Sequence, residues 1–160
     1  KNAWNYEQQV LGYNLRMNEI QAALGISQMK KINKFIKKRN DIAKIYLKNL
    51  KDLPLDFQKI ENGNISSYHL FIIKLKFTNK NINQTKFYNF LKKNKIETNL
   101  HYFPIHLQPF YGNIGFKKND YINSENYSLT VLSIPIYYSL EVKTQMKIIK
   151  IIRKFFQYNN

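Results

Sequence analysis

The segment Leu11-Gly-Tyr-Asn-Leu-Arg-Met-Asn-Glu-Ile-Gln-Ala-Ala-Leu-Gly25 has the pattern of an extended stretch that turns into a helix. Asn18 is a suitable N-cap, and Gln21 stands three residues later, where its amide can bond back to the N–H of the cap. Glu19 in the first turn suits the positive end of the helix dipole. We therefore expect a helix that begins directly after Asn18.

Two polar side chains precede this helix. Asn14 and Arg16 are two residues apart, so on an extended segment they point the same way. A carboxamide and a guanidinium beside a helix start make a plausible anion site. The alternative is that Asn14 closes a turn and Arg16 makes a surface pair, and the residue chemistry alone favours that alternative.

Apolar residues continue at three-to-four spacing from Asn18 as far as Leu50, which predicts a long helix. Such a helix is long for a globular protein, so we expect a kink near Gly25 or a break near Asn33. Further helices are predicted at 85–95 (capped near Asn83), at 124–130, and after Ser139 with an inner face of Val142, Met146, Ile149, Ile152 and Phe156.

Strands are predicted at 68–77, 96–102 and 131–136, with a turn at Asn62-Gly63-Asn64. Pro135 places the third strand at an edge or an end. This order gives an α+β fold, a small sheet covered on one side by helices.

The composition excludes several classes of protein. The chain has 160 residues and no cysteine, so it fits one domain without disulfides or thiolate metal sites. No apolar run approaches the roughly 18–20 residues that cross a membrane, and no signal peptide opens the chain. Because it also lacks an initiator methionine, we expect it to be a piece of a longer protein.

The net charge of +16 raises the possibility of a nucleic-acid-binding module. Against this, only Arg16, Arg39 and Arg153 among the 26 basic residues are arginine, and the lysines are spread along the whole chain. We interpret most of the charge as compositional, carried on solvated faces.

Three blocks of sequence resemble the DegT/DnrJ/StrS family of pyridoxal-phosphate-dependent nucleotide-sugar aminotransferases. The first is Trp4-x-Tyr6-Glu7-Gln8 with Gly12 to Gln28, and the second is Ser67-Tyr-His-Leu-Phe71 with Thr98-Asn-Leu-His-Tyr-Phe-Pro-Ile-His-Leu-Gln-Pro-Phe-Tyr111. The third is Leu132-Ser-Ile-Pro-Ile-Tyr137. The resemblance runs in order from residue 4 to about 153.

The resemblance implies the C-terminal small domain of a fold-type I pyridoxal-phosphate-dependent transferase, with a mostly antiparallel sheet. Residues 1–50 would form the linking segment and long helix from the large domain, and residues 51–160 the small α/β domain. The Schiff-base lysine and its acidic partner would lie upstream of residue 1, so no catalytic residue is assigned here and the chain alone is expected to be inactive.

The resemblance also implies binding roles for particular residues. Asn14 matches the family asparagine that reaches the cofactor phosphate of the neighbouring subunit in a homodimer, with Arg16 beside it. His101 and Tyr102 match the pair near which the family binds the nucleotide sugar, and Asn99 and His106 belong to the same block. The alternative for His101 is a core histidine at a strand end. Ser133 and Pro135 are assigned structural roles, and His101 and His106, five apart without a nearby carboxylate, do not predict a metal site.

The blocks around Tyr6 and His101 are closest to the branch that makes UDP-4-amino-4,6-dideoxy-N-acetyl-β-L-altrosamine on the way to pseudaminic acid. The expected enzyme is a cytoplasmic 4-aminotransferase with glutamate as amino donor, serving bacterial surface-glycan synthesis. Two alternatives stay open at this point: a basic nucleic-acid-binding module, and a non-catalytic regulatory relative of the family.

Overall fold

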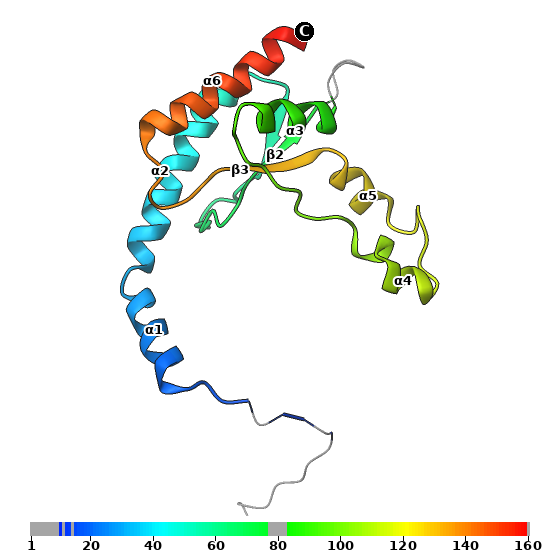
Figure 1. Ribbon diagram of the computed structural model, residues 1–160. Helices are drawn as coiled ribbons and strands as arrows, with labels where there is room; N and C mark the ends of the chain where they lie inside the picture. Colours follow the sequence, from blue (N-terminus) through cyan, green and yellow to red (C-terminus); the bar gives the residue numbers. More distant parts are fainter. Residues whose placement is uncertain (1–9, 11, 14, 77–82, 160) are drawn as a thin grey trace, which may run out of the picture. The chain divides into compact units, whose positions relative to one another are not determined.

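The computed structural model describes residues 10, 12–13, 15–76 and 83–159 (Figure 1). The chain divides into two compact units, residues 1–33 and residues 34–160. The predicted division at residue 50 separates a linking segment and long helix from the small domain. The two compact units do not test that division, and it stays a prediction. None of the described helices is long and apolar enough to cross a membrane.

The first unit contains helix α1 (Glu19–Met29), which begins where the capping signal predicts. Asn18 Oδ1 accepts a hydrogen bond from the Gln21 N–H at 2.8 Å, and Gln21 Oε1 accepts one from the Asn18 N–H at 3.1 Å. This reciprocal pair satisfies two of the free donors at the helix start. None of the α1 residues is buried, although Ile20, Leu24, Ile26 and Met29 lie on it.

A short break at Lys30–Lys31 separates α1 from the next helix, α2 (Ile32–Leu50). The predicted interruption of the long helix is therefore confirmed, between the two positions considered. The apolar series predicted between Asn18 and Leu50 continues along α2. Its later residues lie in the core of the second unit, where Ile42, Ala43, Tyr46 and Leu50 are buried.

The second unit is built on a three-stranded antiparallel sheet, β1 (Leu55–Phe57), β2 (Phe71–Leu75) and β3 (Val131–Ile134), in the order β1-β2-β3. Leu55 pairs with Leu75, and Phe71 pairs with Ile134. The other elements of this unit are α3 (Gln84–Lys93), the 3-10 turn η1 (Ile105–Leu107), α4 (Pro109–Asn113), α5 (Ile122–Ser128) and α6 (Val142–Asn159).

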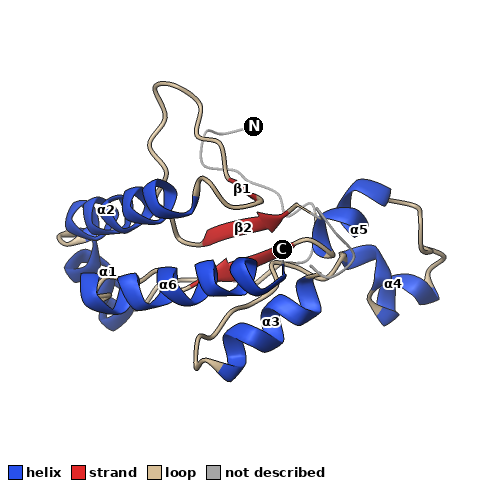
Figure 2. Ribbon diagram, turned by 90° about the horizontal axis from the view of Figure 1, so that it is seen from above, coloured by secondary structure: helices blue, strands red, loops and turns tan. Residues whose placement is uncertain are grey.

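One face of the sheet carries the hydrophobic core. Alternate residues of β2, Phe71, Ile73 and Leu75, are buried against side chains of α2, α3 and α6. Helices α2 and α6 lie side by side (Figure 2), since Gln145 Nε2 donates to the Ile42 carbonyl and Arg153 Nη1 donates to the Asn49 carbonyl, each at 2.8 Å. The predicted α+β fold, a small antiparallel sheet covered by helices, is confirmed.

Several local predictions hold. Helix α3 starts at its predicted cap, where Asn83 Oδ1 accepts from the Lys86 N–H at 2.9 Å. The turn at residues 62–64 is present, and Gly63 takes a φ of +84°, a conformation that glycine adopts without strain. β3 lies at a sheet edge, as the proline at residue 135 predicted.

Three local predictions are wrong. Residues 96–102 form no strand: only Asn99 pairs with Ser133, as an isolated bridge, and the Asn99 side chain then accepts from the Leu100 N–H at 2.9 Å, which turns the chain away from the ladder. Strand β1 was not predicted, because three residues are too few to show an alternating pattern. Helix α6 begins at Val142, three residues after Ser139. Val142 (54% exposed) and Met146 (43% exposed) were predicted on its inner face but lie off it. The buried face is formed by Gln145, Ile148, Ile149, Ile152, Phe155 and Phe156.

Candidate functional site

The two residues predicted at the cofactor phosphate are not tested by the structure. Asn14 lies outside the described residues, and Arg16 is exposed ahead of α1. Their role stays a prediction.

His101 is bound to the edge strand through Ser133. The Ser133 hydroxyl donates to the Asn99 carbonyl at 3.3 Å, and His101 Nε2 lies 2.9 Å from Ser133 Oγ. Because a hydroxyl has one proton to donate, Ser133 Oγ accepts from His101, which assigns the proton of a neutral His101 ring to Nε2. Ser133, for which only a structural role was expected, therefore orients His101.

The other ring nitrogen of His101 has no such partner. Nδ1 is buried and makes no hydrogen bond within the described part of the chain, and the same is true of Thr98 Oγ1 in the segment leading to it. Buried polar atoms without partners are rare in folded proteins, and they cluster where a ligand, a water or another chain completes the site. Thr98 Oγ1 and His101 Nδ1 are therefore positions that a ligand, a water or another chain could complete.

Tyr102 presents its ring to solvent beside His101. Its side chain is 70% exposed, and its ring meets the His101 ring edge-on with centroids 4.7 Å apart. An exposed aromatic side chain beside a partly buried ring is suited to cover an apolar or sugar face of a ligand. The structure thus brings Asn99, His101 and Tyr102 together on the open side of β3.

His106 is in a different environment from His101. It is buried, its Nε2 lies 2.9 Å from Glu125 Oε1, and the Asn119 N–H donates to the same oxygen at 2.7 Å. The hydrogen bond from His106, reinforced by that from Asn119, holds the pKa of Glu125 below its usual range despite the burial of the carboxyl. The ionised carboxylate accepts a hydrogen bond from the His106 Nε2–H, which fixes the orientation of the ring.

The Glu125 partnership was missed by sequence reasoning because 19 residues separate the two side chains. A single glutamate in a polar helix carries no signal of burial. The described residues contain no group of three or more histidine and acidic side chains placed to hold a metal ion.

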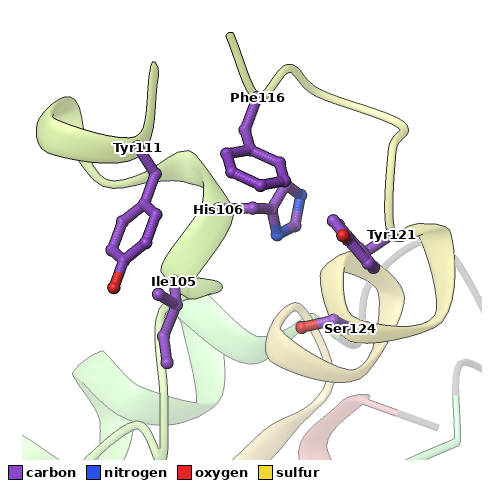
Figure 3. Close-up of a pocket in the computed structure, with 6 residues that line it drawn as sticks. All are labelled: Ile105, His106, Tyr111, Phe116, Tyr121 and Ser124. Atoms are coloured by element: carbon purple, nitrogen blue, oxygen red, sulfur yellow. The ribbon is translucent and has the colours of Figure 1, made fainter. Parts of the chain in front are cut away.

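A pocket of about 320 Å³ opens beside His106 (Figure 3). Tyr111 and Ile105 approach it from one side and Tyr121 and Ser124 from the other, with the His106 ring between them and Phe116 next to that ring. The rings of His106 and Tyr121 have centroids 4.9 Å apart, and those of Phe116 and Tyr121 lie 6.2 Å apart. The site region therefore has a polar part near β3 and an aromatic part near α5.

The described residues do not form a pyridoxal-phosphate site by themselves. Imine formation needs a lysine amine in a sheltered position, whereas every described lysine except the half-buried Lys38 is exposed. We therefore assign no step of cofactor chemistry to the described residues, whose contribution is binding and orientation.

The small antiparallel sheet and its helical cover match the C-terminal part of the aminotransferase fold. The chain belongs to the DegT/DnrJ/EryC1/StrS aminotransferase family, whose profile matches residues 1–153. This is a family of pyridoxal-phosphate-dependent sugar aminotransferases, so the family resemblance noted in the sequence is confirmed.

Three relatives give the scale of the similarity. The protein MJ1066 of Methanocaldococcus jannaschii is 35% identical over 159 residues, covering 98% of this chain and 41% of that protein. The UDP-4-amino-4,6-dideoxy-N-acetyl-beta-L-altrosamine transaminase of Campylobacter jejuni is 31% identical over 148 residues, covering 89% of this chain and 38% of the transaminase.

The third relative is a solved structure. PseC of Helicobacter pylori, an aminotransferase involved in the biosynthesis of pseudoaminic acid, superposes with a TM-score of 0.76 at 28% identity over 99% of this chain and 42% of its own. The chain thus spans about two fifths of the length of these relatives.

Proposed function

We propose that this chain is the C-terminal part of a pyridoxal-phosphate-dependent nucleotide-sugar 4-aminotransferase. The enzyme would convert a 4-keto-6-deoxy sugar nucleotide to the 4-amino sugar, with glutamate as amino donor, in the bacterial cytoplasm. The observation that carries the proposal is the family match over residues 1–153, together with the similarity to a UDP-sugar transaminase over 89% of the chain.

The chain's own residues would bind rather than catalyse. Asn99, His101 and Tyr102 would meet the nucleotide sugar on the open side of β3, with Ser133 fixing the His101 ring and His106 shaping the adjoining pocket. Asn14 and Arg16 would serve the cofactor phosphate across a homodimer. The large domain, with the Schiff-base lysine and its acidic partner, would be supplied by sequence outside this chain.

The preferred substrate would be the UDP-linked keto sugar that leads to UDP-4-amino-4,6-dideoxy-N-acetyl-β-L-altrosamine and then to pseudaminic acid. The test is amination by the complete polypeptide of UDP-, dTDP- and GDP-linked 4-keto-6-deoxy sugars, compared by kcat/KM. We expect the UDP-linked N-acetylated sugar to give the highest value. A higher value for a GDP- or dTDP-linked sugar would refute the substrate assignment and keep the enzyme class, and amination of none of them would refute the class.

A non-catalytic relative of the family is the alternative from another class. The two are separated by the sequence of the large domain, which must contain a lysine in the cofactor site if the proposal is right.

A further inference from the structure

The pocket beside His106 has the dimensions of a site for one ring system. Its volume of about 320 Å³ is at the lower end of the range of roughly 300–1,000 Å³ for small-molecule pockets. A complete nucleotide sugar would not fit inside it, whereas one part of such a molecule would. The lining comes from η1, α4, α5 and the loop that joins the last two, all within the second unit.

The walls of the pocket are mostly aromatic. Tyr111, Phe116 and Tyr121 follow one another at ring-centroid distances of 6.1 and 6.2 Å, and the Tyr121 ring continues to His106 at 4.9 Å. These rings are partly exposed, Tyr111 by 36%, Phe116 by 37% and Tyr121 by 52%, so their faces remain available to a ligand. Aromatic faces of this kind stack on planar heterocycles, and such stacking is tolerant of which base is present.

The polar groups in the pocket are few and fixed. His106 cannot rotate freely, because Glu125 holds Nε2 and the Asn119 N–H holds the same carboxylate oxygen. Nε2 is occupied by this contact, so Nδ1 is the ring nitrogen left for a ligand, and Ser124 contributes a hydroxyl to the lining (Figure 3). An apolar pocket with one or two oriented polar groups selects a flat ring that bears hydrogen-bonding edges.

The charges at the pocket argue against a phosphate there. None of its six lining residues is a lysine or an arginine, and the His106 imidazole is hydrogen-bonded to the buried Glu125 carboxylate. Lys117 and Lys118 lie on the adjoining loop but do not line the pocket. The lining therefore offers a phosphate no lysine or arginine to pair with, whereas an uncharged heterocycle needs none.

We propose that this pocket binds the base of the nucleotide sugar, the choice of a nucleotide as ligand resting on the proposed function. Only two residues separate Tyr102 from Ile105, so the pocket adjoins the segment that would bind the sugar. The base lies among Tyr111, Phe116 and Tyr121, with a hydrogen-bonding edge toward His106 and Ser124. The 98–102 segment is left for the sugar.

The test uses the 160-residue chain and uncharged nucleosides, so that the charge of +16 cannot attract the probe. Uridine, thymidine and guanosine are titrated while the side-chain NMR signals of Ile105 and Tyr121 are followed, with ribose as the base-free control. We expect saturable shifts with at least one nucleoside and none with ribose. Phe116→Leu should weaken that binding at least fivefold, since stacking on an aromatic ring contributes about 1–3 kcal/mol per base.

Phe110→Leu is the matched control, because Phe110 lies in α4, is 68% exposed and is not among the residues that line the pocket. It should change the affinity less than twofold. Equal losses in the two variants, shifts with ribose as large as with the nucleosides, or shifts that follow protein concentration instead of nucleoside would each overturn the inference. A failed titration beside successful amination by the complete polypeptide would reject the base site alone. Nucleoside binding without any amination would reject the proposed function and leave the pocket.

Discussion

At the scale of single residues, the structure adds partners that the sequence could not indicate. The resemblance pointed to His101 and His106, but their environments depend on Ser133 and Glu125, which lie 32 and 19 residues away. Such pairs are brought together by the fold and leave no local spacing signal. By contrast, the two asparagine caps at residues 18 and 83 were predictable, because the donor and acceptor lie within three residues.

The Glu125 carboxyl should titrate below the ordinary glutamate pKa of about 4.3, because the hydrogen bonds from His106 and Asn119 stabilise its ionised form. A lowered pKa means that its stabilising contribution is present above the pKa of the unfolded chain and is lost as the pH falls through the lowered value. The check is the ¹³C shift of the Glu125 carboxyl against pH. In His106→Asn the titration should move up toward the ordinary value, and an unchanged midpoint in that variant would contradict the assignment.

At the scale of secondary-structure elements, one arginine of α2 donates hydrogen bonds to the backbone before β2 and after β3. Arg39 Nη1 donates to the carbonyls of Tyr68 and His69 at 2.9 Å and of Ile136 at 3.2 Å, which precede β2 and follow β3. Arg39→Met would leave these carbonyls, of which those of Tyr68 and Ile136 are partly buried, without the donor, so the free energy of unfolding in urea should fall by about 1.5–3 kcal/mol. Lys37→Met, an exposed neighbour on α2, should change it by less than about 0.5 kcal/mol. Equal effects of the two changes would show that the Arg39 bonds contribute nothing measurable.

The contact between α2 and α6 contains a polar group that is only half satisfied. Gln145 is fully buried, and its Nε2 donates to the Ile42 carbonyl, but its Oε1 has no partner within the described residues. Gln145→Met keeps the shape and removes both the bond and the unsatisfied oxygen, two effects of similar size and opposite sign. The free energy of unfolding should therefore change by less than about 1 kcal/mol, as for the exposed control Gln157→Met. A loss above about 2 kcal/mol would show that the hydrogen bond outweighs the buried oxygen.

The elements that were predicted correctly are those with strong local signals. Helices α1 and α3 carry caps, and β3 is a short, mostly apolar run with a proline after it. The failures at residues 96–102 and at Ser139 have a common cause, since an apolar pattern does not say which face tertiary packing will choose. Asn99 ended the strand with its own side chain, and α6 turned Gln145 inward where Met146 was expected.

At the scale of the whole molecule, exposed lysines are spread over the three helices α2, α3 and α6. We expect DNA and RNA to bind without sequence preference and to lose affinity steeply with salt, as counterion release requires. The measurement is the affinity for two unrelated duplexes between about 50 and 200 mM salt, where a protein that makes many phosphate contacts loses about 10³–10⁵ in affinity. Sequence-selective nanomolar binding at physiological salt would favour the nucleic-acid module.

The most direct test of the account follows the amino nitrogen. The complete polypeptide, pyridoxal phosphate, ¹⁵N-labelled glutamate and the UDP-linked 4-keto-6-deoxy sugar are incubated together, and the sugar is examined by NMR. We expect ¹⁵N bonded to carbon 4 of the sugar, one 2-oxoglutarate for each amino sugar, and no transfer by the 160-residue chain alone. Transfer by the chain alone, or the absence of ¹⁵N from the sugar with an intact cofactor site, would contradict it.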